Sequence, residues 1–170
     1  VMPMSGPLAA YGQVTNLGVE LAHKQQPTLK NGDTIKIVLL DNKGDKVETA
    51  TATTRLISSD KVVAILGALT STNTAQAIAI ADKKEIPVIA SVATNDQLTA
   101  KREFANRVCF TDSFQGEVVA NYAKAQAYKT AVVVVDQSQV YSLGLAKAFE
   151  TAFKKNGGEI ASADNVGTRE

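Results

Sequence analysis

The chain has 170 residues, of which 45% are hydrophobic and 21% are charged. These shares are typical of a folded globular protein and exclude a disordered tail or a collagen-like fibre. The formal net charge is +1, so charge gives no reason to expect nucleic acid or an anionic membrane as a partner. With a single cysteine, Cys109, the chain has no internal disulfide.

Strand patterns and helix patterns alternate along the chain. A loop at 5–12 leads into a helix through Val14, Leu17 and Leu21. The next expected strands are 35–40, 62–66, 87–90, 107–110, 130–135 and one opening at Ile160, and the next expected helices are 47–58, 72–84, 113–127 and 142–155. The apolar strand runs are continuous, which indicates burial on both faces, as in parallel sheets. With right-handed crossovers, the order predicts an α/β fold of doubly wound parallel sheets with helices on both faces.

Hydroxyl side chains follow two neighbouring strands of this predicted sheet. Ser71 and Thr72 follow strand 62–66 at a helix start, and Thr94 follows strand 87–90. Ligands of open α/β sheets bind beyond the carboxyl ends of the strands, and a helix start favours an anion. Two interpretations stay open: each residue caps a helix or fills a turn, or together they hold one carboxylate.

Signals of catalysis are weak. The sequence contains no common glycine-rich phosphate loop and no zinc-ligand spacing, and it has one histidine. We therefore expect no enzyme activity, cofactor or metal. Asp41 and Asp45 are interpreted as residues of a plain loop, although two carboxylates at this spacing are compatible with a cation. Tyr11 and Tyr141 are either packing residues or residues at the mouth of a cleft.

Five stretches resemble the leucine/isoleucine/valine-binding group of the type I periplasmic binding proteins. They are MPMSGPLAAYGQ (2–13), KVVAILGALTSTNT (61–74), IPVIASVATNDQLT (86–99), RVCFTDSFQG (107–116) and VYSLGLAKAFETAFKKNGGEI (140–160). Members of this family bind a ligand between two α/β lobes and serve ABC importers for branched-chain amino acids and related small carboxylates. The resemblance therefore implies a binding protein without catalysis.

The resemblance also implies how the chain is organised. Residues 1–112 would form the N-terminal part of ligand-binding lobe 1, and residues 113–170 would begin lobe 2. The two-lobe fold would be incomplete in this chain, and the acidic partner of a ligand ammonium would lie outside it. The expected partners are a small ligand and a membrane permease, with no nucleic acid. The intact protein is expected to be a periplasmic or otherwise extracytoplasmic monomer, and a lipid anchor stays open.

Five residues would hold the polar groups of an amino-acid ligand, by the same resemblance. The hydroxyls of Ser71 and Thr94 and the backbone N–H of Thr72 would bind the α-carboxylate. The carbonyl of Val92 would accept from the α-ammonium, with Ala93 beside it.

Two tyrosines complete the implied site. Tyr11 would form a wall of the side-chain pocket, and Tyr141 would close over the ligand from lobe 2. Two alternatives from other classes stay open, a sensory or receptor domain of the same fold and an enzyme of flavodoxin-like type. An adjoining DNA-binding or membrane segment would favour the first, and a bound cofactor or turnover would favour the second.

Overall fold

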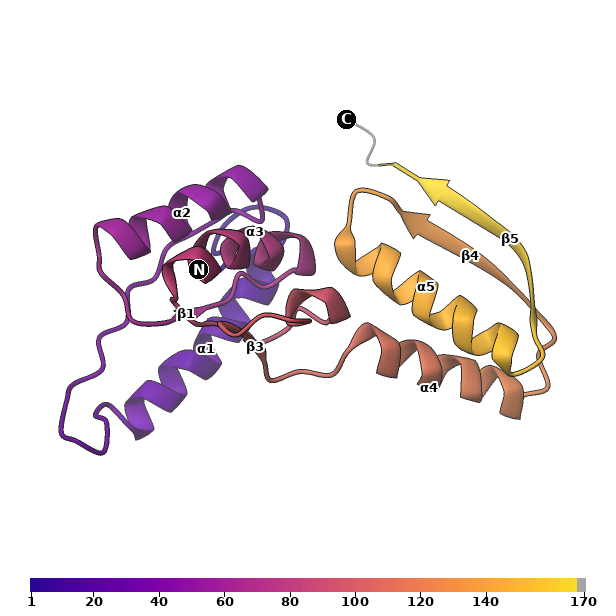
Figure 1. The fold of residues 1–170 in the computed structure, drawn as a ribbon, viewed down its shortest axis with the longest axis horizontal. Coiled ribbons are helices and arrows are strands. Elements are labelled where there is room, and N and C mark those ends of the chain that lie inside the picture. Colours follow the sequence, from indigo (N-terminus) through magenta and orange to yellow (C-terminus); the bar gives the residue numbers. More distant parts are fainter. Residues whose placement is uncertain (168–170) are drawn as a thin grey trace.

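A computed structural model describes residues 1–167 of the chain. The elements are α1 (Ala9–Gln25), α2 (Lys46–Ser58), β1 (Ile65–Leu66), α3 (Ser71–Ala81), η1 (Asp82–Lys84), β2 (Val88–Ala90), η2 (Asp96–Leu98), β3 (Ala105–Arg107), α4 (Asp112–Ala125), β4 (Thr130–Asp136), α5 (Val140–Lys155) and β5 (Glu159–Val166). They form two groups, α1 to β3 and α4 to β5, joined by one crossing of the chain between β3 and α4 (Figure 1). The α/β fold with parallel sheets, predicted from the sequence, is confirmed.

The first sheet is parallel, with the order β1-β2-β3. The N-terminal segment 1–3 lies beside β1, because the backbone N of Val1 donates to the carbonyl of Leu66 at 2.8 Å. On its other side, Met2 forms a parallel bridge with Asp41. The carboxyl ends of neighbouring strands therefore meet at one edge of the sheet, where the segments after Leu66 and Ala90 begin.

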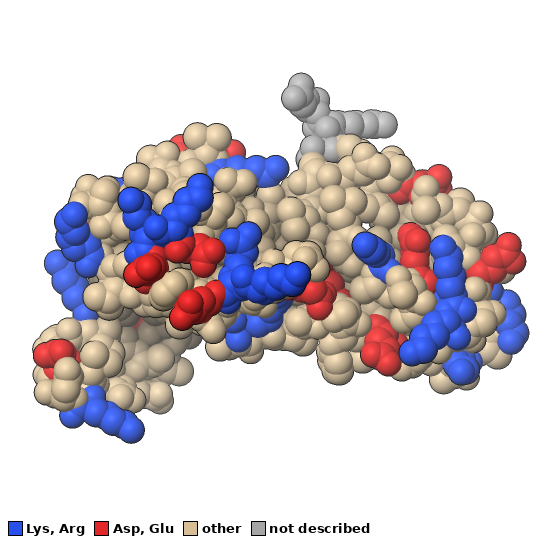
Figure 2. All heavy atoms as spheres, in the orientation of Figure 1, with Lys and Arg blue, Asp and Glu red and all other residues tan. Residues whose placement is uncertain are grey.

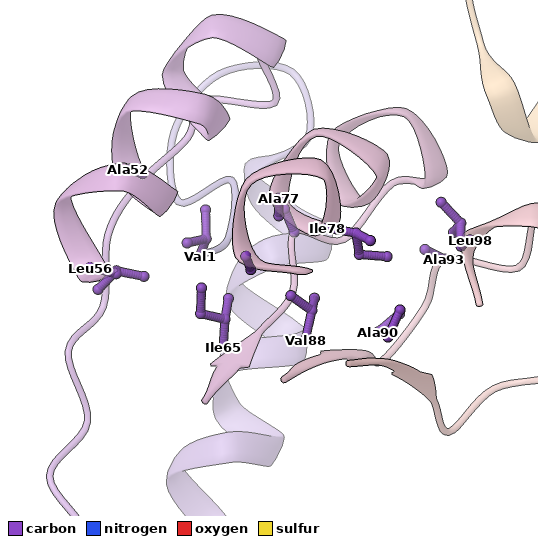
Figure 3. Packing of buried hydrophobic residues seen from close by; sticks show 13 residues of the cluster. Val1, Ala52, Leu56, Ile65, Ala77, Ile78, Val88, Ala90, Ala93 and Leu98 are labelled. Carbon is purple, nitrogen blue, oxygen red and sulfur yellow. The ribbon is translucent and has the colours of Figure 1, made fainter. Parts of the chain in front are cut away.

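The core of this group lies between the strands and the helices α2 and α3 (Figure 3). Ile78 of α3 and Leu56 of α2 face Ile65 and Val88 of the strands, and all four are almost fully buried. Helix α1 packs on segment 1–3 so closely that a Cβ on Gly12 would lie 2.0 Å from the carbonyl oxygen of Pro3. Burial of these apolar side chains is the main force that holds the strand-end loops in place.

Three expected strands are wrong in extent. Segment 35–40 forms no regular strand, because its neighbour is only the short segment 1–3 and the pairing is reduced to the bridge at Asp41. The strand expected at 62–66 is confined to β1. The strand expected at 107–110 instead covers β3, because its partner β2 ends at Ala90 and leaves no ladder for residues beyond Val108.

The second group contains the parallel strand pair β4–β5 and the helices α4 and α5, which run side by side in the same direction (Figure 1). Phe153 of α5 is 1% exposed and stacks on Phe149, with ring centroids 5.2 Å apart. Helix α5 ends at Lys155, and Gly157 adopts a φ of +86°, as the lysine and glycine stop signals predict. The helices and strands expected over residues 113–160 are thus confirmed to within a few residues.

The prediction that the strands are buried on both faces is wrong for β4 among the described residues. Val133 and Val135 are buried, whereas Val132 and Val134 are 61% and 62% exposed. Alternate strand residues point to opposite faces, and α4 and α5 cover only one of them. The first sheet, by contrast, has α1 on one face and α2 and α3 on the other.

Charged side chains of both signs are interspersed over the face shown in Figure 2. This mixture agrees with the net charge of +1. Within residues 1–167, no helix combines the length and the apolar character needed to cross a membrane.

Candidate functional site

The start of α3 places the first pair of predicted site residues. Thr70 precedes the helix in extended conformation, and its Oγ1 accepts from the backbone N–H of Asn73 at 3.2 Å. This cap leaves Ser71 and Thr72 in the first turn, where backbone N–H groups have no intrahelical acceptor. Both side chains are nearly buried, at 2% and 5% exposed. Thr70 is thus the residue that caps α3, and the side chains of Ser71 and Thr72 are not needed for capping.

The segment after β2 lies directly beside this helix start. Ser71 Oγ accepts from the backbone N–H of Asn95 at 3.3 Å, so the two strand-end loops are in contact. Ala93 and Thr94 are buried, and Val92 is 48% exposed. The described residues make no hydrogen bond to the Val92 carbonyl, which leaves it free as an acceptor.

Asp112 binds Thr94 at two points, a link that sequence reasoning missed. The Thr94 hydroxyl donates to Asp112 Oδ1 at 2.7 Å, and the Asp112 backbone N–H donates to the Thr94 carbonyl at 2.9 Å. Asp112 is fully buried, and its Oδ2 has no hydrogen-bond partner among the described residues. Burial raises the pKa of this carboxyl, while the hydrogen bond from Thr94 opposes that rise.

Arg107 fixes the shape of the loop that carries Val92 to Asn95. Its guanidinium donates to the carbonyls of Ala93 at 3.3 Å and Asn95 at 2.8 Å, and to Thr99 Oγ1 at 2.8 Å. The planar guanidinium group carries five N–H donors, so one arginine can bind several acceptors at once. Sequence reasoning missed this residue too, since an arginine at the end of a strand carries no signal of its own.

The start of α5 meets the start of α3. Thr72 Oγ1 accepts from the backbone N–H of Val140 at 3.0 Å and donates to Gln139 Oε1 at 3.1 Å. The Asn95 amide donates to the Val140 carbonyl at 3.1 Å. Gly144 allows this approach, because a Cβ there would lie 2.3 Å from both Asn95 Nδ2 and Asp112 Oδ2.

The two tyrosines differ in their placement. Tyr141 directly follows Val140 at this junction, is 41% exposed, and its Oη accepts from Gln115 Nε2 at 3.4 Å. Tyr11 is 67% exposed on α1, and within residues 1–167 no hydrogen bond joins its side chain to the other predicted site residues. The structure therefore brings Ser71, Thr72 and Thr94 together with the start of α5 but does not bring Tyr11 to them.

A groove of about 530 Å³ lies next to this junction, between η2, α4 and α5. Asn95 and Gly144 line it, together with the charged side chains of Glu117 and Lys147. None of the seven predicted site residues lines this groove. Within residues 1–167, no group of three or more histidine, cysteine, aspartate or glutamate side chains is placed to hold a metal ion.

Comparison with known proteins identifies the protein family of this chain. Residues 1–169 match the profile of a family described as periplasmic binding protein. Because the match covers nearly the whole chain, the chain belongs to the periplasmic binding protein family.

Individual relatives place it within that family. The chain is 29% identical over 166 residues to the Leu/Ile/Val-binding protein of Escherichia coli (strain K12), covering 96% of this chain and 45% of that protein. A crystal structure of a leucine-binding protein from Thermotoga maritima superposes with a TM-score of 0.91 at 36% identity, covering 99% of this chain and 47% of that one. A branched-chain amino acid transporter substrate-binding protein from Streptococcus pneumoniae, in complex with isoleucine, gives 0.86 at 35%, covering 99% and 49%.

These similarities confirm the resemblance to the type I leucine/isoleucine/valine-binding group, to which the chain belongs. The chain spans about half the length of the relatives that it matches.

Proposed function

We propose that the protein is an extracytoplasmic solute-binding protein of an ABC importer and that it binds a branched-chain or related amino acid. The ligand would lie between two lobes, of which residues 1–112 form most of the first and residues 113–170 begin the second. Its partner would be a membrane permease, and it would bind without catalysis. Membership of the family and the printed names of its relatives support this role.

The junction of three segments carries the proposal. Ser71 of α3, the Thr94 loop and the start of α5 meet through the hydrogen bonds from Asn95 and Val140. Elements from both proposed lobes thus converge where the strand ends of the first sheet open. A zwitterion needs donors for its carboxylate and acceptors for its ammonium, and neutral hydroxyl and backbone groups would make both kinds of contact here.

Each predicted residue has a role in this site. Ser71 Oγ already accepts a hydrogen bond, so its proton is free for the ligand carboxylate, beside the Thr72 N–H. The free carbonyl of Val92 would accept from the ammonium, and Ala93 would pack beside it. The Thr94 hydroxyl, which the resemblance assigns to the α-carboxylate, already donates to Asp112, so its lone pairs would face the ammonium instead.

The aromatic residues would bind the apolar part of the ligand. Tyr141 would cover it from the second lobe, and Tyr11 would form a wall of its side-chain pocket. Burial of an aliphatic ligand side chain would contribute roughly 1.5–3 kcal/mol. Because Ser71 and Thr94 are 2% and 6% exposed, the lobes must part to admit a ligand. A hinge motion at the crossing before α4 would provide this opening.

The test is calorimetry of the full-length protein with L-leucine, L-isoleucine and L-valine. Ser71→Ala should weaken the binding of the preferred amino acid at least tenfold, because the carboxylate loses a donor in a dry site. Ser58→Ala is the control, since the Ser58 hydroxyl donates to a carbonyl of its own helix α2. Equal affinities of Ser71→Ala and the unmodified protein would refute the site.

A further inference from the structure

We propose that Asp112 is a positioning residue that determines ligand specificity: it takes the proton of the Thr94 hydroxyl and so makes the site select α-amino acids over the same carboxylates without an amino group. The inference rests on the proposed function and adds a residue that contributes to its selectivity, beside the acidic partner expected outside this chain.

The first step concerns the hydroxyl of Thr94. It donates to Asp112 Oδ1 at 2.7 Å. A hydroxyl has one proton and two lone pairs, so Thr94 Oγ1 keeps only lone pairs for a ligand. It can accept from an ammonium but cannot donate to a carboxylate. Ser71 has the opposite polarity, because its oxygen accepts from Asn95 and its proton stays free.

The second step concerns how firmly this polarity is held. Asp112 lies in the first turn of α4, where a negative charge is favoured, and its backbone N–H donates to the Thr94 carbonyl at 2.9 Å. Gly144 packs over the carboxylate, because a Cβ there would lie 2.3 Å from Oδ2. The Asp112 carboxylate and the Thr94 backbone are therefore held in fixed positions, and the Thr94 hydroxyl has little freedom to turn its proton toward the ligand.

The third step concerns charge. Asp112 is fully buried and forms no ion pair among the described residues. Arg107 on β3 lies close enough for its charge to favour the ionised carboxyl, but its guanidinium donates to carbonyls and Thr99, and Asp96 on η2 adds a second negative charge nearby. A buried charge without a partner is costly. A ligand ammonium held by Thr94 Oγ1 would stand one hydroxyl away from this charge and compensate it.

Selectivity follows from these three steps. An α-amino acid would present an ammonium to the lone pairs of Thr94. Its deaminated analogue would leave those lone pairs without a donor and would bring its carboxylate without the ammonium that compensates the charge of Asp112. A site built to hydrogen-bond one group rejects the analogue that lacks it.

Asp112→Asn in the full-length protein tests the inference. The asparagine amide can donate to Thr94 Oγ1, which releases the hydroxyl proton toward the ligand and removes the buried charge. The probes are pairs: L-leucine with 4-methylpentanoate, and L-phenylalanine with 3-phenylpropanoate. Calorimetry gives, for each pair, the dissociation constant of the analogue divided by that of the amino acid. We expect this ratio to fall at least tenfold in Asp112→Asn and to stay unchanged in the control Glu103→Gln, which removes an exposed carboxylate.

The outcomes separate the inference from the function on which it rests. Amino-acid binding that depends on Ser71, with the same ratio in Asp112→Asn as in the unmodified protein, would overturn the role of Asp112 and leave the function intact. An unmodified protein that binds neither member of any pair would overturn both. If Asp112→Asn does not fold, the near-isosteric Thr94→Val should lower the same ratio, and an unchanged ratio there would also overturn the inference.

Discussion

The carboxylate of Asp41 ties the loop before α1 to the edge of the first sheet. It accepts from the backbone N–H groups of Met4 and Lys43, both at 2.8 Å, and from the Ser5 hydroxyl at 2.5 Å. Burial alone would raise the pKa of Asp41, but the bond from Ser5 and those from the backbone together hold it below its usual value. Asp45 is the N-cap of α2, where its side chain accepts from the backbone N–H groups of Val47 and Glu48.

This arrangement predicts a pH-dependent contribution of Asp41 to stability. A carboxyl group whose pKa is lowered on folding stabilises the native state above its unfolded pKa of about 3.9, and that contribution is lost as the pH falls through the folded pKa. Asp41→Asn should therefore lower the melting temperature at pH 7, and the difference should disappear in acid. Glu103→Gln, which removes an exposed carboxylate, is the control. A difference that persists unchanged below about pH 3 would contradict the role of the charge.

Residues of the candidate site differ in how far the sequence predicts them. Ser71 and Thr94 were predictable as neighbours, because each follows a strand and parallel neighbours end at the same edge. Asp112 and Arg107 were not, because they act through hydrogen bonds to a loop that lies 12 to 18 positions earlier in the chain. The role of Tyr11 was inferred from the family resemblance alone, and its contact with the ligand stays a prediction.

At the scale of elements, the contact between α4 and α5 depends on one glycine. Gly116 of α4 is buried, and a Cβ there would lie 2.6 Å from the backbone N of Phe149 and 2.7 Å from the carbonyl carbon of Ala148. These are backbone atoms, so the two helices would have to move apart to accommodate a side chain. Gly18 of α1 has no atom within 4 Å of such a Cβ.

The two glycines therefore predict opposite effects of the same substitution. Gly116→Ala should lower the free energy of unfolding by about 1–3 kcal/mol, as overpacking does. Gly18→Ala should raise it by about 0.5–1 kcal/mol, because an exposed helical alanine loses less backbone entropy on folding. Urea denaturation of both variants measures this. Stabilisation by Gly116→Ala would show that the helices are not in close contact at that position.

Helices were predicted more accurately than strands, for a physical reason. Helix α5 carries its own periodicity and stop signals within its sequence. A strand exists only where a partner extends alongside it, and the partners of 35–40 and 107–110 stop early. The exposed faces of Val132 and Val134 have the same origin, since burial depends on what packs over a strand rather than on the strand itself.

At the scale of the whole molecule, two hydrophobic clusters are separate from each other. One contains residues between Val1 and Ala105, and the other residues between Ala120 and Ile160. Between them lie polar contacts, chiefly those of Thr72 and Asn95 with the start of α5 and that of Thr94 with Asp112 of α4. Polar contacts of this kind separate at less cost than an apolar core, as the proposed ligand-dependent opening and closing of two lobes would require.

The central claim is that an amino acid binds at this junction between the two groups of elements. A crystal structure of the full-length protein with its preferred amino acid tests it most directly. The ligand carboxylate should lie within about 2.7–3.2 Å of Ser71 Oγ, with the ammonium at a similar distance from Thr94 Oγ1. A ligand bound instead in the groove lined by Glu117 and Lys147, away from Ser71 and Thr94, would contradict the account.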